Sequence, residues 1–306
     1  MTIPELLAAV RRVEVRTNRI VNDAMVGAYL SHFKGRGMDF EELREYLPGD
    51  EVRDIDWNVT HRMGRPFVKR FREERELATV LAVDVSGSSG FGSADRTKRE
   101  FAAEIAATLA MAASHNSDKV SLLLFSDQVE LFLPARKGRR HVLRLIRELL
   151  VFSPRRRQTS IPVALAFLNH IIPRRAIVFL ITDFLHSMES QARAGERSGR
   201  DALQEAALTN ARHDLVCLHI SDPREKTLPP AGLLTIEDAE TGDLVELDSN
   251  RALVREKFAK ANSERLARLD EALRRAGIDT LRFSTTEDFA AVLQRFFETR
   301  RARRRR

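Results

Sequence analysis

Cysteine is almost absent from this chain of 306 residues, because Cys217 is the one copy. No disulfide can form within the chain, which excludes the small secreted domains that depend on disulfides. A lone cysteine in the apolar run LVCLHI is typical of a core residue. Since this cysteine usage fits a reducing compartment, we expect a cytoplasmic protein.

Long hydrophobic runs are also missing. No stretch approaches the ~20 apolar residues that span a bilayer. The N-terminal sequence MTIPELLAAVRRVEVRTNRI is interrupted by arginines, so it lacks the apolar core of a signal peptide. We expect an amphipathic helix there and no membrane span.

Several motifs of common enzymes are not present. The eight histidines show no H-E-x-x-H spacing, so we expect no zinc site. The glycine-containing segment GSSGFGSADRTK lacks the G-K-[ST] ending of a phosphate-binding loop and the third glycine of G-x-G-x-x-G. The G-x-S-x-G turn of serine hydrolases has no match either.

Positive charge is concentrated at the C-terminus. The net charge is +7, and residues 300–306, RRARRRR, hold six arginines, without which the chain is close to neutral. Such a tail can contact nucleic acid, anionic lipid or an acidic partner, and the simpler interpretation is a solvated helix end. No aromatic residues are interleaved with the arginines and no nucleic-acid motif is present, so nucleic-acid binding is an alternative that we do not favour.

Strand and helix patterns alternate from Glu76 onward, which predicts a Rossmann-like α/β fold with a mostly parallel sheet covered by helices on both faces. The expected strands are 77–84, 119–127, 129–135, 176–183, 214–220 and 279–286, and the expected helices are 95–116, 138–152, 161–172, 201–213, 249–277 and 287–301. A hairpin is expected at about 232–248, turning at Thr241 and Gly242.

Two domains follow from this change of pattern. We expect a small N-terminal α+β module over residues 1–76, which joins one helix to a segment dense in glycine, proline and charge. Residues 77–306 form the larger domain.

A cluster of oxygen-bearing side chains is expected at one edge of the sheet. Asp84 ends a buried strand, and Ser86 and Ser88 follow at alternate positions. Thr159 opens a helix, and Asp183 ends another strand. Because ligands bind at the carboxyl ends of parallel strands, these side chains are expected on the same edge. Carboxylates and hydroxyls are hard ligands that suit Mg²⁺.

This D-x-S-x-S pattern, with a helix-opening threonine and a second strand-ending aspartate, resembles the metal-ion-dependent adhesion site of von Willebrand factor type A domains. The resemblance implies that Asp84, Ser86, Ser88, Thr159 and Asp183 bind Mg²⁺ (or Mn²⁺ or Ca²⁺). It also implies that a protein partner offers an acidic residue to the metal.

The N-terminal segment is similar to one bacterial group, the domain-of-unknown-function 58 family. The similarity lies in GRG (35–37), LREYLPGD (43–50), VRDIDW (52–57) and VKRFREERE (68–76). It implies a partnership with a MoxR-type AAA+ ATPase, because the family's genes commonly lie beside such ATPases. Some members carry two membrane-spanning helices before this region; this chain has none, so anchoring is not implied.

We therefore interpret the chain as a non-catalytic, metal-dependent interaction module that acts with a MoxR-type ATPase in protein maturation or complex assembly. Arginines 155–157 are expected on the rim of the metal site, where they favour acidic ligands.

The enzymatic alternative is a metal-dependent hydrolase, with His186 or Asp54 as its base. Asp54 and Asp56 are expected on one face of a strand, where ion pairs with Arg44 or Arg53 are the simpler role.

Overall fold

The chain forms two compact units, residues 1–32 with 78–306 and residues 33–77. The computed structural model describes residues 3–21, 37–74, 78–185 and 202–304. We expected the first helix to belong with the N-terminal module. The structure groups it with the larger unit, because α1 (Ile3–Ile20) packs on two helices of that unit, α4 and α5.

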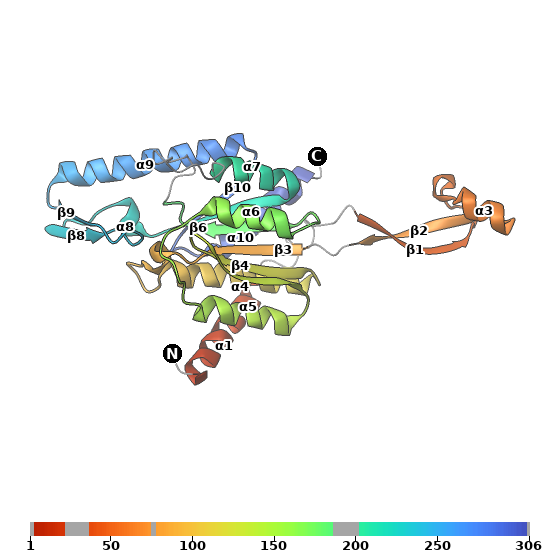
Figure 1. The fold of residues 1–306 in the computed structure, drawn as a ribbon, viewed down its shortest axis with the longest axis horizontal. Coiled ribbons are helices and arrows are strands. Elements are labelled where there is room, and N and C mark those ends of the chain that lie inside the picture. The colour runs from red at the N-terminus through yellow and green to blue at the C-terminus, as the bar shows by residue number, and fades with distance from the viewer. Residues whose placement is uncertain (1–2, 22–36, 75–77, 186–201, 305–306) are drawn as a thin grey trace. The chain divides into compact units, whose positions relative to one another are not determined.

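A six-stranded sheet lies at the centre of the larger unit, in the order β10-β7-β6-β3-β4-β5 (Figure 1). All neighbouring strands are parallel except β5, which runs antiparallel to β4 at the edge. The strands are β3 Ala78–Asp84, β4 Lys119–Phe125, β5 Val129–Arg136, β6 Ile177–Thr182, β7 Asp214–Ser221 and β10 Asp279–Ser284. The expected mostly parallel α/β sheet is confirmed.

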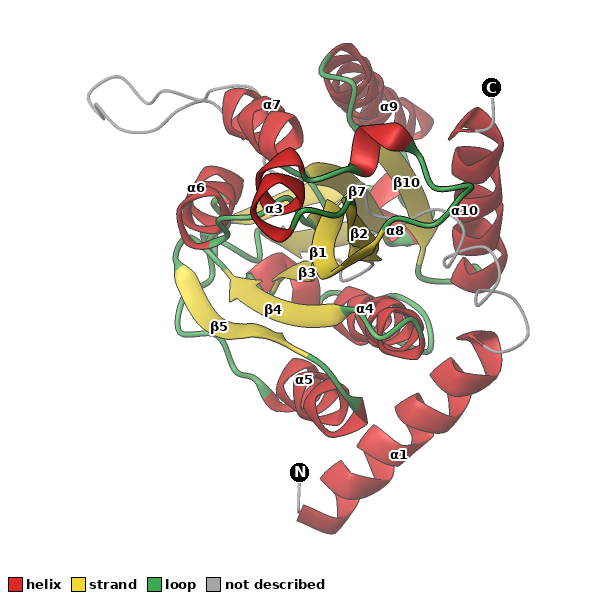
Figure 2. Ribbon diagram, turned by 90° about the vertical axis from the view of Figure 1, so that its right-hand side faces the viewer, coloured by secondary structure: helices red, strands yellow, loops and turns green. Residues whose placement is uncertain are grey.

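Helices cover both faces of this sheet. Figure 2 shows α6, α7 and α9 on one face and α4, α5 and α10 on the other. Their bounds are α4 Lys98–His115, α5 Arg139–Val151, α6 Ile161–Ile171, α7 Ala202–Arg212, α8 Pro223–Lys226, α9 Ala252–Arg275 and α10 Phe289–Arg304. Among the described helices, none is both long and apolar enough to cross a membrane.

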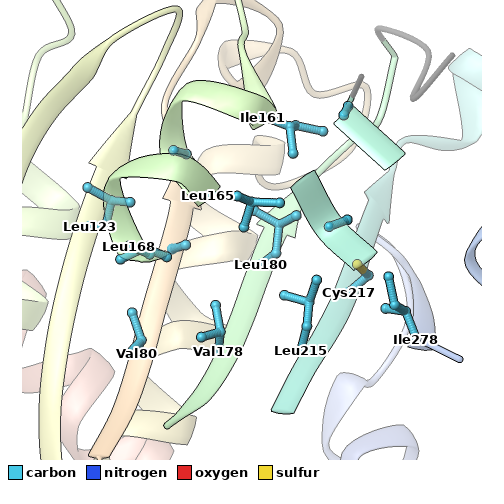
Figure 3. Close-up of a cluster of buried hydrophobic side chains, with 14 of the residues drawn as sticks. Val80, Leu123, Ile161, Leu165, Leu168, Val178, Leu180, Leu215, Cys217 and Ile278 are labelled. Atoms are coloured by element: carbon cyan, nitrogen blue, oxygen red, sulfur yellow. The ribbon is translucent and has the colours of Figure 1, made fainter. Parts of the chain in front are cut away.

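The core on the α6 side is built from alternate residues of the strands (Figure 3). Val80, Val178 and Cys217 face the helices there, and all three are completely buried. Burial raises the pKa of the Cys217 thiol to about 12, as expected for a structural cysteine. On the opposite face, Phe101 of α4 packs edge-on against Phe289 of α10, with ring centroids 5.6 Å apart. Phe101 also packs edge-on against Phe283 of β10, with ring centroids 6.4 Å apart, which joins this helix layer to the sheet.

The expected hairpin is present as β8 (Leu233–Glu237) and β9 (Leu244–Asp248), which pair antiparallel. The long helix after it begins at Ala252 rather than at Ser249. The physical reason is that the Ser249 hydroxyl is used at the base of the hairpin. It accepts a hydrogen bond from Ala231 N (2.9 Å) and donates one to Gly232 O (2.8 Å).

The smaller unit contains an antiparallel pair, β1 (Gly37–Glu45) and β2 (Phe67–Glu74). Between them lie the 3-10 turn η2 (Val52–Asp54) and the short helix α3 (Trp57–Met63). Of the quoted GRG segment, residues 35 and 36 lie outside the described residues.

Asp54 and Asp56 do not share a strand face, so that expectation was wrong. Asp56 is the N-cap of α3 and accepts hydrogen bonds from the N–H groups two and three residues ahead, at 2.9 and 3.2 Å. Its ion pair is with Lys69, 3.0 Å away, rather than with an arginine. Arg44 pairs with Asp50 instead, at 2.6 Å.

Candidate metal centre

Two buried carboxylates meet where neighbouring strands end. Asp84 is the last residue of β3, and Asp183 directly follows β6. The parallel register places Val83 opposite Ile181, so both chains leave the sheet at the same edge. Asp84 is 4% exposed and Asp183 is 7% exposed. The structure thus brings together the two acids predicted from the sequence.

The two serines lie on a tight turn directly after Asp84. The chain enters a 3-10 turn, η3 (Gly87–Gly90), and Ser86 N donates to Oδ1 of Asp84 over 2.9 Å. This turn sets the hydroxyls of Ser86 and Ser88 side by side, 3.2 Å apart. Ser88 also hydrogen-bonds to Asp183 and lowers the pKa of that carboxyl. Four of the five predicted ligands therefore form one connected cluster.

The Asp84 carboxylate has an unusual environment. Its Oδ2 accepts a hydrogen bond of 2.6 Å from the Thr182 hydroxyl, and its Oδ1 accepts from Ser86 N. Burial, and then the negative charge of Asp183, raise the pKa of Asp84 to about 7. A metal cation bound beside this carboxylate would offset both effects and favour its charged form.

Asp183 is held by a buried lysine. Lys98 of α4 donates from Nζ to Oδ2 of Asp183 over 2.6 Å and also contacts Glu225 of α8. Burial alone would raise the pKa of Asp183, but the Lys98 charge and hydrogen bond outweigh it, and the pKa lies below its ordinary value. Leu185 N donates to the other oxygen, Oδ1, at 3.1 Å. Both carboxylate oxygens are therefore fixed in place.

The turn after Asp183 is strained. Phe184 is buried and has φ of 48°, a left-handed conformation that bulky residues rarely adopt. This turn points Leu185 N back at the aspartate and presents the Phe184 carbonyl to Arg265, whose Nη1 donates over 2.5 Å. The strain thus contributes to orienting Asp183.

Thr159 lies at the rim and uses its hydrogen bonds elsewhere. Its N–H and its hydroxyl donate to the two carboxylate oxygens of Glu240, at 3.1 and 2.8 Å. The segment before it touches the serine turn, because Gly87 N donates to Arg157 O over 2.8 Å. Thr159 is thus joined to the other four residues through the main chain rather than through its hydroxyl.

The donor set is suited to a hard divalent cation. With Asp84 ionised, the site holds three carboxylates (Asp84, Asp183 and Glu225). The cations of Lys98 and Arg265 interact with two of them, Asp183 and Glu225, which leaves one negative charge. Carboxylate and hydroxyl oxygens are the ligands that Mg²⁺ prefers. Within the described ranges, no group of three or more His, Cys, Asp or Glu side chains forms a metal site, so the hydroxyls would have to complete this one.

Four residues of the site were not predicted from the sequence: Thr182, Lys98, Glu225 and Glu240. The pattern DRTKRE around Lys98 indicates a helix start and nothing more. Glu240 lies in DAETGD, which we interpreted only as a hairpin turn. Of these four, Thr182 alone could have been predicted from the sequence as a site residue, because it directly precedes Asp183 at a buried strand end.

The other candidates do not belong to this cluster as described, or lie outside the described residues. His186 is outside them. Asp54 belongs to the smaller unit and is exposed. The side chains of residues 155–157 are exposed, and Glu130 accepts hydrogen bonds from Arg155 N and Arg156 N, both at 3.1 Å.

The chain is similar to several proteins of unknown function. The family model described as "Protein of unknown function DUF58" matches residues 42–268. The uncharacterized protein Rv1480 of Mycobacterium tuberculosis is 32% identical over 300 residues, which make up 97% of this chain and 90% of that protein. The uncharacterized protein MAV169 of Mycobacterium avium is 29% identical over 171 residues, 55% of this chain and 94% of that protein.

Solved structures with a similar fold include the conserved hypothetical protein BatB from Bacteroides thetaiotaomicron. It is 16% identical, with a TM-score of 0.48, over 74% of this chain and 99% of that chain. Another is the mussel byssus proximal thread matrix protein 1 "with zinc occupied MIDAS motif", 17% identical with a TM-score of 0.36 over 48% of this chain and 38% of that chain. The family match and the full-length relative establish that this chain belongs to the DUF58 family, described as proteins of unknown function.

Proposed function

We propose that this chain is a non-catalytic, metal-dependent protein–protein interaction module. Mg²⁺ (or Mn²⁺ or Ca²⁺) would be held by Asp84, Ser86, Ser88, Thr159 and Asp183. The observation that carries the proposal is the pairing of two buried carboxylates with two hydroxyls 3.2 Å apart at one sheet edge. Bound there, the ion would balance the carboxylates and present a coordination position to an acidic residue of a partner.

The non-catalytic part of the proposal rests on how the polar groups of the described site are used. Both oxygens of Asp84 already accept hydrogen bonds from within the chain, and so do both oxygens of Asp183. The Lys98 ammonium is shared between two carboxylates. A general base needs access to a substrate proton, and the two aspartates are only 4% and 7% exposed.

The partner that we propose is a MoxR-type AAA+ ATPase, as the family resemblance implies, in protein maturation or complex assembly in the cytoplasm. The exposed arginines of residues 155–157 adjoin the serine turn through the Arg157 carbonyl. Their charge would attract an acidic partner surface toward the metal.

Calorimetric titration of Mg²⁺ or Mn²⁺ tests the proposal. Wild type and the double variant Ser86→Ala/Ser88→Ala are titrated, then repeated with the cognate MoxR-type ATPase. Ser89→Ala is the matched control, because Ser89 is also buried but its hydroxyl donates to the Ser86 carbonyl, over 2.7 Å. We expect metal binding, and metal-dependent ATPase binding, in wild type and the control only. Equal metal binding by the double variant, or none by wild type, would refute the proposal.

A further inference from the structure

The tip of the β8–β9 hairpin reaches into the candidate metal centre. All residues from 233 to 248 are described, and among them Glu240 alone is buried, at 8% exposed. Its carboxylate is bound at two points by Thr159, through the N–H at 3.1 Å and the hydroxyl at 2.8 Å. The predicted metal ligand Thr159 is thus already bound to an acidic side chain of the same chain.

A second contact brings the same tip against the serine turn. A Cβ added at Gly87 would lie 2.3 Å from the carbonyl oxygen of Ala239, the residue before Glu240. No side chain fits in that space, so the glycine between the two serines permits the close approach of the hairpin. Two independent contacts, at Gly87 and at Thr159, therefore hold the tip at the site.

The tip is preformed, whereas the rest of the hairpin is weakly held. Oδ1 of Asp238 accepts hydrogen bonds from Glu240 N (2.8 Å) and Thr241 N (3.1 Å), which fixes the turn that presents the acid. Leu233 and Leu244 on the strands are 68% and 66% exposed. Since a two-stranded hairpin alone is marginally stable, the contacts of its tip can be exchanged at low cost.

We propose that the N–H and hydroxyl of Thr159 form a carboxylate-binding position, which Glu240 fills within the chain and which an acidic residue of the partner takes over by displacing it. The inference rests on the proposed function, because it identifies the ligand of that same site. The ligand class is an acidic protein segment that offers a glutamate or aspartate on an exposed turn, as the hairpin tip does.

A peptide of residues 236–245, IEDAETGDLV, tests this when it is labelled and added to the full chain with Mg²⁺. Fluorescence anisotropy compares wild type with Glu240→Ala, whose position is empty, and with Asp243→Asn. The last is the matched control, because Asp243 is an exposed acid of the same turn that bonds Thr241. We expect Glu240→Ala to bind the peptide at least about tenfold more tightly than wild type and the control, since charge-assisted bonds are gained. A peptide with glutamine at position 240 should not bind.

Hydrogen exchange at the Thr159 amide gives a second readout, together with the variant Gly87→Ala, which pushes the tip away without removing the acid. Exchange should be faster in Glu240→Ala and in Gly87→Ala, and unchanged in Asp243→Asn. Mg²⁺ binding without any gain in peptide affinity would overturn the inference and leave the proposed function standing. Peptide binding to Glu240→Ala that does not need Mg²⁺ would support the carboxylate position and refute the metal dependence.

Discussion

Lys98 and Asp183 form an ion pair that is almost entirely shielded from water, with Nζ and Oδ2 2.6 Å apart and side-chain exposures of 3% and 7%. The same ammonium also contacts Glu225. Burial alone would lower the pKa of Lys98, but the two carboxylates outweigh it and the pKa is raised. The pair therefore joins α4 and α8 to the end of β6, beside the candidate metal ligands.

Replacing Lys98 with methionine should destabilise the protein strongly. The change keeps the apolar stem but leaves the buried Asp183 and the partly buried Glu225 without this cation, and breaking a buried ion pair typically costs about 3–5 kcal/mol. Urea unfolding in the presence of a chelator measures the free energy of unfolding. Lys260→Met is the control, because that lysine is 79% exposed and its one ion pair is long, at 3.9 Å. A loss no larger than that of the control would show that the carboxylates are satisfied by other groups.

His219 should make the stability of the protein sensitive to acid. Burial lowers its pKa to about 3, with Asp183 opposing and Arg265 and Arg282 adding to the effect. The unfolded chain takes up a proton below about pH 6.5, whereas the folded chain does not. The neutral ring therefore makes its full contribution to the free energy of unfolding above pH 6.5. That free energy falls by up to about 1.4 kcal/mol per pH unit as the pH drops toward 3.

The variant His219→Leu tests this dependence. It removes the titrating ring from the contact with Phe184, whose ring centroid lies 5.8 Å away. Urea unfolding between pH 4 and 7 should show a shallower loss of stability on acidification than in wild type. His170→Leu, at an exposed position of α6, should leave the slope unchanged. Parallel slopes in wild type and His219→Leu would contradict the prediction.

Arg300 begins the basic tail but has a structural role. Its guanidinium binds both oxygens of Asp214, at 2.7 and 3.0 Å, and one oxygen of Asp279 at 2.5 Å. These bonds fix α10 to the ends of β7 and β10. We expect Arg300→Ala to reduce the free energy of unfolding by about 2 kcal/mol. Arg295→Ala, on the exposed side of the same helix, should change it little; equal losses would mean that the ion pairs contribute nothing.

Asp56 caps the helix α3, whereas Asp54 is an exposed acid, so the two positions can be compared. Asp56→Ala removes the acceptor for two N–H groups of α3, so the amides of its first turn should exchange about fivefold faster. Asp54→Ala is the control at an exposed position two residues away. Hydrogen exchange followed by mass spectrometry measures both. Faster exchange in Asp54→Ala alone would show that the cap is not at Asp56.

The strand ends of the sheet could be predicted because their signal is local. The apolar runs that end in Asp84 and Asp183 predict buried parallel strands, and parallel strands end at one edge. The expectation that Asp54 and Asp56 share a strand face was wrong, because it rested on their local spacing alone. Two acids at a spacing of two residues also fit a turn followed by a helix cap. Asp56 is the cap because its side chain accepts hydrogen bonds from the N–H groups that follow it.

The order of the elements, the strand-ending acids and the alternate serines follow from the sequence alone, because these depend on hydropathy and on neighbours in the chain. Which side chains meet at the site depends on the tertiary fold. Lys98 reaches an aspartate 85 residues away, and Thr159 reaches Glu240 across 81 residues. Such pairs depend on strand order and, for Glu240, on the close approach of the hairpin at Gly87. No local sequence pattern encodes either feature, because side chains far apart in sequence pair only after the backbone has brought them to one edge of the sheet.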